Sequence, residues 1–83
     1  MAHRIEYKAS VVRDLKRLDR QSARRVLAKL ERELSENPDK GLPLKGAFQG
    51  LFRLRVGDYR VIYAKTRGGV LVLRIGHRSD IYR

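Results

Sequence analysis

Residues 51–82 constrain the fold more than any other part of the sequence. Three runs rich in β-branched and aromatic residues occur there, separated by short segments that contain glycine: 51–56, 59–64 and 70–75. Such runs are typical of strands, and glycine supplies the positive φ angles that short hairpin loops need. The sequence therefore predicts an antiparallel three-stranded meander.

The first of these strands is amphipathic. Its period of two places apolar side chains on one face and Arg53 and Arg55 on the other. Arg60 follows beyond the turn, so pairing of the first two strands brings it close to both. Because clustered guanidinium groups repel one another, an anionic ligand would relieve the repulsion. A solvated strand face is the alternative interpretation.

The length predicts a single domain over residues 1–83, which can bury roughly 60% of the surface of the unfolded chain. The sequence contains no cysteine, which excludes disulfides and thiolate metal sites. His3 and His77 are far apart, so no metal or other cofactor is expected. The apolar runs are far shorter than the ~20 residues that span a bilayer, and no secretory segment follows Met1. We therefore expect a cytoplasmic protein.

The net charge of +11 is unevenly distributed. Residues 1–40 have a net charge of +4 and residues 41–83 a net charge of +7, so the half that contains the meander is the more basic. A sequence pI near 10.9 favours binding to polyanions, of which nucleic acid is the commonest in a cytosol. Solubility alone is the alternative explanation for the charge.

Before the meander, the sequence predicts a short strand and a hairpin of two antiparallel helices. The strand is 3–8, and Ser10 is placed to cap a first helix whose apolar residues are Val11, Val12, Leu15 and Leu18. The second helix is expected from near Asp19 or Gln21 to about Glu36, before Pro38. The predicted class is α+β, with the helices covering one face of a single sheet.

Two further segments complete the chain. Residues 37–50 contain both prolines and predict a connecting loop, with Leu44 and Phe48 pointing inward. Arg74, on the last strand, is expected to pair with a carboxylate such as Glu6. The segment 76–83 contains an imidazole, two guanidinium groups, a carboxylate and a phenol, and no apolar pattern explains them.

These segments resemble the RelE/ParE superfamily of bacterial and archaeal toxins, in the RelE-like branch of type II toxin–antitoxin systems. The resemblance spans nearly the whole chain. Its most specific parts are Gly-Asp-Tyr-Arg-Val-Ile-Tyr over 57–63 and His-Arg-Ser-Asp-Ile-Tyr over 77–82, with Leu-Lys-Gly over 44–46 and Phe-Arg-Leu-Arg over 52–55 as further matches.

The resemblance implies a ribosome-dependent endoribonuclease, an mRNA interferase that cuts mRNA in the decoding site. It implies as partners a RelB-like antitoxin, the ribosome and mRNA, and a toxin–antitoxin complex that binds operator DNA. By position it assigns the catalytic residues to Arg53, Arg55, Arg60, Arg78 and the stacking aromatic Tyr82.

RNA cleavage without metal needs a base for the 2′-hydroxyl, positive charge for the transition state and an acid for the leaving oxygen. Guanidinium forks match phosphate oxygens, so Arg53, Arg55 and Arg60 are expected to bind the scissile phosphate and Arg78 to stabilise charge. Arginine stays protonated, however, whereas the family often has lysine at the first two positions. Proton transfer is therefore expected of His77 or Tyr82, and a structural hydrogen bond is the alternative for His77.

Two other functions remain open at this point. A ParE-like toxin would inhibit DNA gyrase without cutting nucleic acid, and a basic RNA-binding module would have no toxin role. The fold alone does not decide among the three functions.

Overall fold

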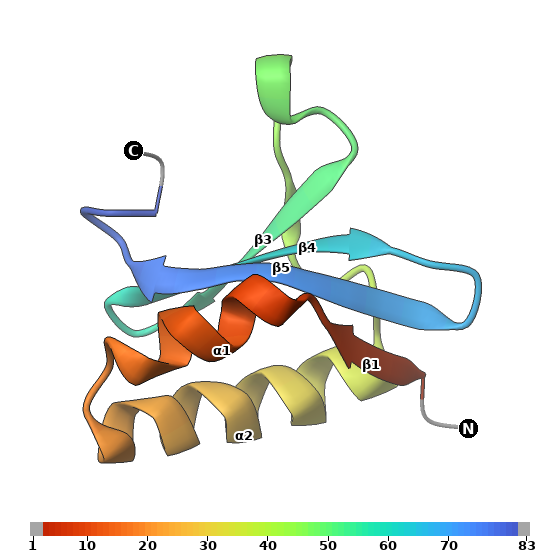
Figure 1. Ribbon diagram of the computed structural model, residues 1–83. Coiled ribbons are helices and arrows are strands. Elements are labelled where there is room, and N and C mark those ends of the chain that lie inside the picture. The colour runs from red at the N-terminus through yellow and green to blue at the C-terminus, as the bar shows by residue number, and fades with distance from the viewer. Residues whose placement is uncertain (1–2, 82–83) are drawn as a thin grey trace.

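The computed structural model describes residues 3–81 and arranges them as a sheet with two helices on one side (Figure 1). In chain order the elements are β1 (Arg4–Tyr7), α1 (Ala9–Lys16), α2 (Arg20–Glu36), β2 (Leu42–Pro43), the 3₁₀ helix η1 (Gly46–Phe48), β3 (Leu51–Val56), β4 (Tyr59–Lys65) and β5 (Gly69–His77). The α+β class and the antiparallel meander β3-β4-β5 are confirmed. Gly57 adopts a φ of 59° in the turn between β3 and β4, as a tight hairpin requires.

The sheet has five strands rather than the meander alone, in the order β1-β5-β4-β3-β2. β1 pairs in parallel with β5, so the sheet is mixed, whereas the sequence predicted only the antiparallel meander within it. The helices and the connecting segment carry the chain to the far edge, and the meander then returns toward β1. Within the connecting segment, β2 pairs with the start of β3. At Gly69 a Cβ atom would lie 1.8 Å from the Arg4 carbonyl oxygen, so the β1–β5 pair requires glycine there.

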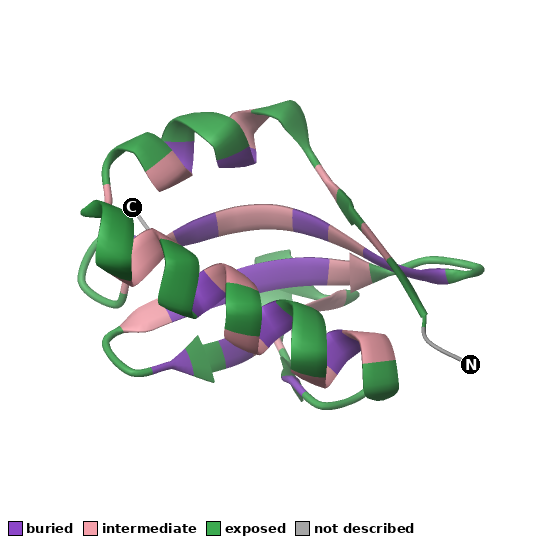
Figure 2. Ribbon diagram, turned by 90° about the horizontal axis from the view of Figure 1, so that it is seen from below, coloured by how far each residue is buried: buried purple, intermediate pink, exposed green. Residues whose placement is uncertain are grey.

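The core lies between the helices and one face of the sheet, and the outer faces of the helices are exposed (Figure 2). α2 contributes the fully buried Val26, Leu30 and Leu34. Val12, one of the four apolar residues expected in the first helix, is 57% exposed and does not lie on its buried face. The reason is that α1 packs mainly on β5, so its buried residues are Val11 and Asp14.

α1 runs along the part of β5 that extends beyond its pairing with β1. Polar side chains of α1 form hydrogen bonds with the backbone groups of β5 that β1 leaves unpaired. Ser10 Oγ donates a hydrogen bond to the Leu73 carbonyl at 3.3 Å and does not cap α1, whose N-cap is Lys8. Asp14 Oδ2 accepts from the Ile75 amide at 2.9 Å. An edge strand with paired backbone groups is protected from pairing with other chains.

Asp14 Oδ2 also accepts from Arg74 Nε at 3.1 Å, so the expected pairing of Arg74 with a carboxylate is confirmed, with Asp14 rather than Glu6 as the partner. Asp19 is the N-cap of α2, because its Oδ2 accepts from the Ser22 amide at 3.1 Å, and the helix begins within the predicted range of Asp19 to Gln21.

The connecting segment is attached to the sheet through Tyr63. This fully buried residue donates from its hydroxyl to the Pro38 carbonyl at 2.8 Å and accepts from the Gly41 amide at 2.9 Å. Burial raises the pKa of the Tyr63 phenol above its usual value. Leu44 is half-buried, but Phe48 is 46% exposed and does not point into the core, because η1 stands away from the sheet (Figure 1). Across residues 3–81, no helix is long and apolar enough to span a membrane.

Candidate functional site

The face of the sheet opposite the helices, here called the open face, carries most of the arginines singled out in the sequence. In the β3–β4 register Arg55 is directly opposite Arg60, and Arg53 is opposite Ile62. Residues opposite each other point to the same face, so these arginines share one side. Arg55 is exposed and Arg53 is half-buried. The sequence-based expectation that the first hairpin brings these three residues together agrees with this register.

Arg60 differs from its neighbours because it is only 7% exposed. Its Nη1 donates to the carbonyl oxygens of Gly57 at 2.9 Å and Tyr59 at 3.0 Å, so the guanidinium is held against the backbone of the turn. Gly76 is opposite Arg60 on β5, and a Cβ at Gly76 would lie 3.2 Å from Ile81 Cδ1. The segment after β5 therefore folds back over Gly76, the neighbour of Arg60 on the adjacent strand.

Arg78 is also attached to the turn at 57–58, through contacts with Asp58. Its amide donates to the Asp58 carbonyl at 2.8 Å, and its Nε lies 4.0 Å from Asp58 Oδ1. Both side chains are mostly exposed, so the ion pair is weak and the backbone bond fixes the position. Arg55, Arg60 and Arg78 thus gather around the turn at 57–58, with Arg53 about 7 Å farther along β3.

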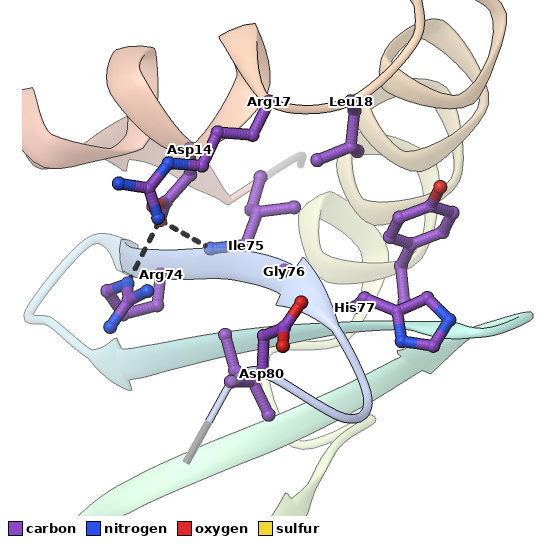
Figure 3. Close-up of a pocket in the computed structure, with 10 residues that line it drawn as sticks. Asp14, Arg17, Leu18, Arg74, Ile75, Gly76, His77 and Asp80 are labelled. Atoms are coloured by element: carbon purple, nitrogen blue, oxygen red, sulfur yellow. Dashed lines mark hydrogen bonds and ion pairs between the residues drawn. The ribbon is translucent and has the colours of Figure 1, made fainter. Parts of the chain in front are cut away.

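His77 lies on the side of the sheet that faces the helices, not on the open face. It is opposite Tyr59 in the β4–β5 register, and the two rings meet edge to face with centroids 5.8 Å apart. Its Nδ1 accepts from the Ser79 amide at 3.2 Å and lies 2.8 Å from Ser79 Oγ. The imidazole borders a hollow of about 380 Å³ on the helix side of the sheet, which Asp14, Arg17, Arg74 and Asp80 also line (Figure 3).

A β-bulge explains the orientation of His77. Tyr63 is opposite Val72 and Ile62 is opposite Arg74, so Leu73 is an additional residue on β5. One additional residue exchanges the faces of all the side chains that follow. Strict alternation from Val72 would have put His77 on the open face. Tyr82, the predicted stacking residue, lies outside the described residues.

Sequence reasoning missed Asp14, which is 6% exposed and joins α1 to β5. The available signal was an acidic residue three positions after Val11, on the buried face of the first helix. No group of three or more His, Asp or Glu side chains in the described part of the chain could hold a metal ion. The chemistry that the arginine cluster can provide is the binding and stabilisation of anionic oxygen, because guanidinium groups stay protonated.

Two kinds of sequence comparison agree on the family. The family model for the ParE toxin of the type II toxin–antitoxin system parDE matches residues 5–82. Toxin RelE of Mycobacterium tuberculosis (strain ATCC 25618 / H37Rv) is 38% identical over 78 residues, which cover 90% of this chain and 80% of that protein. Toxin RelG of the same organism is 33% identical and covers 100% of this chain and 99% of that protein.

Solved structures share the fold over nearly their whole length. The toxin–antitoxin complex RelBE2 from M. tuberculosis has a TM-score of 0.84 at 27% identity and covers 94% of this chain and 100% of the matched one. The archaeal RelE–RelB complex from Pyrococcus horikoshii OT3 has a TM-score of 0.74 at 30% identity, with 96% and 99% covered. The chain is therefore a RelE-like toxin that belongs to the RelE/ParE superfamily of type II toxin–antitoxin systems.

Proposed function

We propose that this toxin is an mRNA interferase, a ribosome-dependent endoribonuclease that cuts mRNA in the decoding site. The observation that carries the proposal is the cross-strand pair Arg55–Arg60 on the open face, with Arg78 attached to the same turn. This arrangement concentrates positive charge where no helix covers the sheet, and guanidinium groups can bind the oxygens of a phosphate group through two parallel hydrogen bonds.

The proposed role of each arginine follows from how exposed its side chain is and from the hydrogen bonds it makes. Arg55, which is exposed, and Arg53 bind the scissile phosphate. Arg60, held by the turn, supplies fixed positive charge as the 2′-hydroxyl attacks and negative charge grows on the phosphate oxygens. Arg78 stabilises the leaving 5′-oxygen, directly or through water. No metal takes part in this mechanism.

Tyr82 stacks on a base beside the cleaved bond, as the family resemblance implies. Proton transfer by His77 requires the substrate to reach around the end of the sheet, because the ring faces the helix side. If the single-turnover cleavage rate and its pH profile are the same in His77→Ala as in the wild type, His77 has no role in proton transfer.

Dependence on the ribosome follows from the shortage of groups able to position a free RNA strand. The arginines bind phosphate but do not orient the 2′-hydroxyl for attack in line with the leaving oxygen. A ribosome that holds the message in that geometry supplies a positioning effect, which can be large.

A RelB-like antitoxin is the proposed partner in the cell. The support is that similar toxin chains were solved as RelB–RelE complexes. A segment ordered on binding would cover the open face with acidic side chains, and the resulting complex would bind operator DNA.

The test is primer extension on a translated message, with purified protein, with and without ribosomes. The Arg55→Ala variant removes an exposed arginine of the cluster, and the control Arg67→Ala removes an exposed arginine from the turn after β4. We expect ribosome-dependent cuts inside codons with the wild type and the control, and few or none with Arg55→Ala. Equal cutting by all three proteins would mean that the arginine cluster on the open face takes no part in cleavage.

The description of the matching family model as a ParE toxin favours one second candidate, the inhibition of DNA gyrase without cleavage. A folded wild-type protein that makes no cuts on ribosomes but blocks supercoiling by gyrase would replace the nuclease proposal with this one.

A further inference from the structure

The turn that follows β5 is closed by one residue, His77. The amides of Asp80 and Ile81 donate to the His77 carbonyl oxygen at 2.9 and 3.1 Å. The amide of Ser79 donates to Nδ1 of the His77 ring at 3.2 Å, and Ser79 Oγ lies 2.8 Å from the same nitrogen. Three successive amides, those of residues 79–81, therefore bond to His77.

The His77 side chain acts in this turn as an N-cap does at the start of a helix. In an N-cap, a side-chain acceptor takes a hydrogen bond from the amide two or three positions later, and Asn, Asp and Ser are preferred there. In His77 the acceptor is Nδ1, two positions before Ser79. A ring nitrogen that accepts from an amide has no proton of its own, so the proton of the neutral imidazole is on Nε2.

The His77 ring has a second contact, which holds it against the sheet. It meets the Tyr59 ring edge to face, with centroids 5.8 Å apart, and both residues are half-buried. The contact lies at the border of the hollow on the helix side (Figure 3). One side chain thus joins β4, through Tyr59, to the turn after β5.

Arg78, inside this turn, is held by its backbone rather than by its side chain. Its amide donates to the Asp58 carbonyl at 2.8 Å, whereas its side chain is 63% exposed and its Nε lies 4.0 Å from Asp58 Oδ1. An ion pair this exposed does little to fix the guanidinium group. The direction in which the Arg78 side chain leaves the chain therefore depends on the backbone of residues 77–81.

We infer that His77 is a positioning residue for Arg78: its Nδ1 orders the turn 77–81 and so keeps the Arg78 guanidinium beside the turn at 57–58. The inference rests on the proposed nuclease function, in which Arg78 stabilises the leaving 5′-oxygen. It gives His77 a role that needs no contact with RNA, in keeping with a ring that faces the helix side. Because Nδ1 is already bonded to Ser79, the ring holds the turn without serving as a base.

Two variants separate the acceptor of His77 from its ring. His77→Asn keeps a side-chain acceptor, in a residue type that caps well, and has no imidazole to transfer a proton. His77→Phe keeps an aromatic ring beside Tyr59 and has no acceptor. The matched control is His3→Phe at the other histidine, which is exposed and bonds to the Ser35 carbonyl near the end of α2.

Hydrogen exchange at the Ser79 amide, followed by NMR in the purified toxin, tests the turn without any substrate. Losing a capping acceptor shifts a local equilibrium about 2- to 30-fold. We expect the Ser79 amide of His77→Phe to exchange faster by a factor in this range. His77→Asn and His3→Phe should stay within about twofold of the wild type. Equal exchange in the wild type and His77→Phe would overturn the inference.

The single-turnover rate of cleavage on ribosomes tests whether the order of the turn matters to Arg78. A group that is in place for only part of the time lowers the rate in proportion. We therefore expect His77→Phe to cut about 2- to 30-fold more slowly than the wild type, and His77→Asn and His3→Phe to cut at close to the wild-type rate. All rates are measured well below the unfolding temperature of each variant.

Two results of the cleavage assay would also overturn the inference. Equal loss in His77→Asn and His77→Phe would mean that cleavage needs the imidazole itself rather than an acceptor. Unchanged cleavage by His77→Phe, together with faster exchange, would mean that Arg78 acts without an ordered turn. A wild type that cuts no message would end the nuclease proposal instead, while the exchange rates still decide whether His77 orders the turn.

Discussion

Asp14 on α1 accepts a hydrogen bond from the backbone amide of Ile75 at 2.9 Å and so closes the edge of β5 that β1 leaves uncovered. Asp14→Ala leaves that buried amide unpaired, which costs about 1–3 kcal/mol of unfolding free energy. Urea denaturation measures this loss. Asp14→Asn keeps an acceptor oxygen and should lose less unfolding free energy. Glu6 is the carboxylate first suggested as the partner of Arg74, and Glu6→Gln should be as stable as the wild type. Equal stability of Asp14→Ala and wild type would contradict this role.

The local signals of the sequence predicted the elements well. The strand 51–56 has the observed bounds of β3, and α2 begins at Arg20, between the two predicted starting points Asp19 and Gln21. Both signals are local, because alternation and helix starts depend on neighbouring residues alone. The parallel β1–β5 pair and the short β2 depend on residues distant in the sequence, which no local pattern encodes.

The candidate site was predictable where it depends on one hairpin. The turn at 57–58 sets the register of Arg55 and Arg60, so their shared face follows from the sequence. The orientation of His77 did not follow, because a bulge at Leu73 exchanges the faces of β5 and nothing in the sequence 70–77 marks it. The return of Ile81 over Gly76, the neighbour of Arg60 on the adjacent strand, did not follow either, because it is a tertiary contact.

Gly69 and Gly68 offer a matched pair of substitutions in one turn. In Gly69→Ala the added methyl group would collide with the backbone of Arg4, whereas at Gly68 a Cβ meets nothing within 4 Å. We expect Gly69→Ala to lose at least about 1–3 kcal/mol of unfolding free energy, as overpacked sites do, and Gly68→Ala to stay near the wild type. Denaturant unfolding compares the two. Similar losses for both would show that β1 does not pack against β5 at this point.

Asp19 makes the stability of α2 depend on pH. Hydrogen bonds from Ser22, first its side chain and then its backbone amide, lower the pKa of the Asp19 carboxyl below its ordinary value of 3.8. A lowered pKa in the folded state means that the stabilisation is complete above the ordinary value and is lost as the pH falls through the lowered one. Asp19→Asn keeps the capping oxygen but does not titrate. Unfolding midpoints measured from neutral pH to about 2 should therefore fall more steeply in the wild type than in Asp19→Asn. Parallel curves would contradict the prediction.

The contact of Ile81 with Gly76 predicts that the segment after β5 controls access to Arg60. Arginine-selective dicarbonyl reagents modify exposed guanidinium groups, so in the wild type Arg55 should react well before Arg60, which is 7% exposed. Ile81→Ala removes the covering side chain and should speed modification of Arg60 while Arg55 reacts as before, as peptide mass spectrometry would show. Because Ile81 is 5% exposed, the variant should also lose about 2–5 kcal/mol of stability, so the reaction is run well below its melting temperature. If Arg60 reacts equally slowly in both proteins, its bonds to Gly57 and Tyr59, rather than the covering segment, protect it.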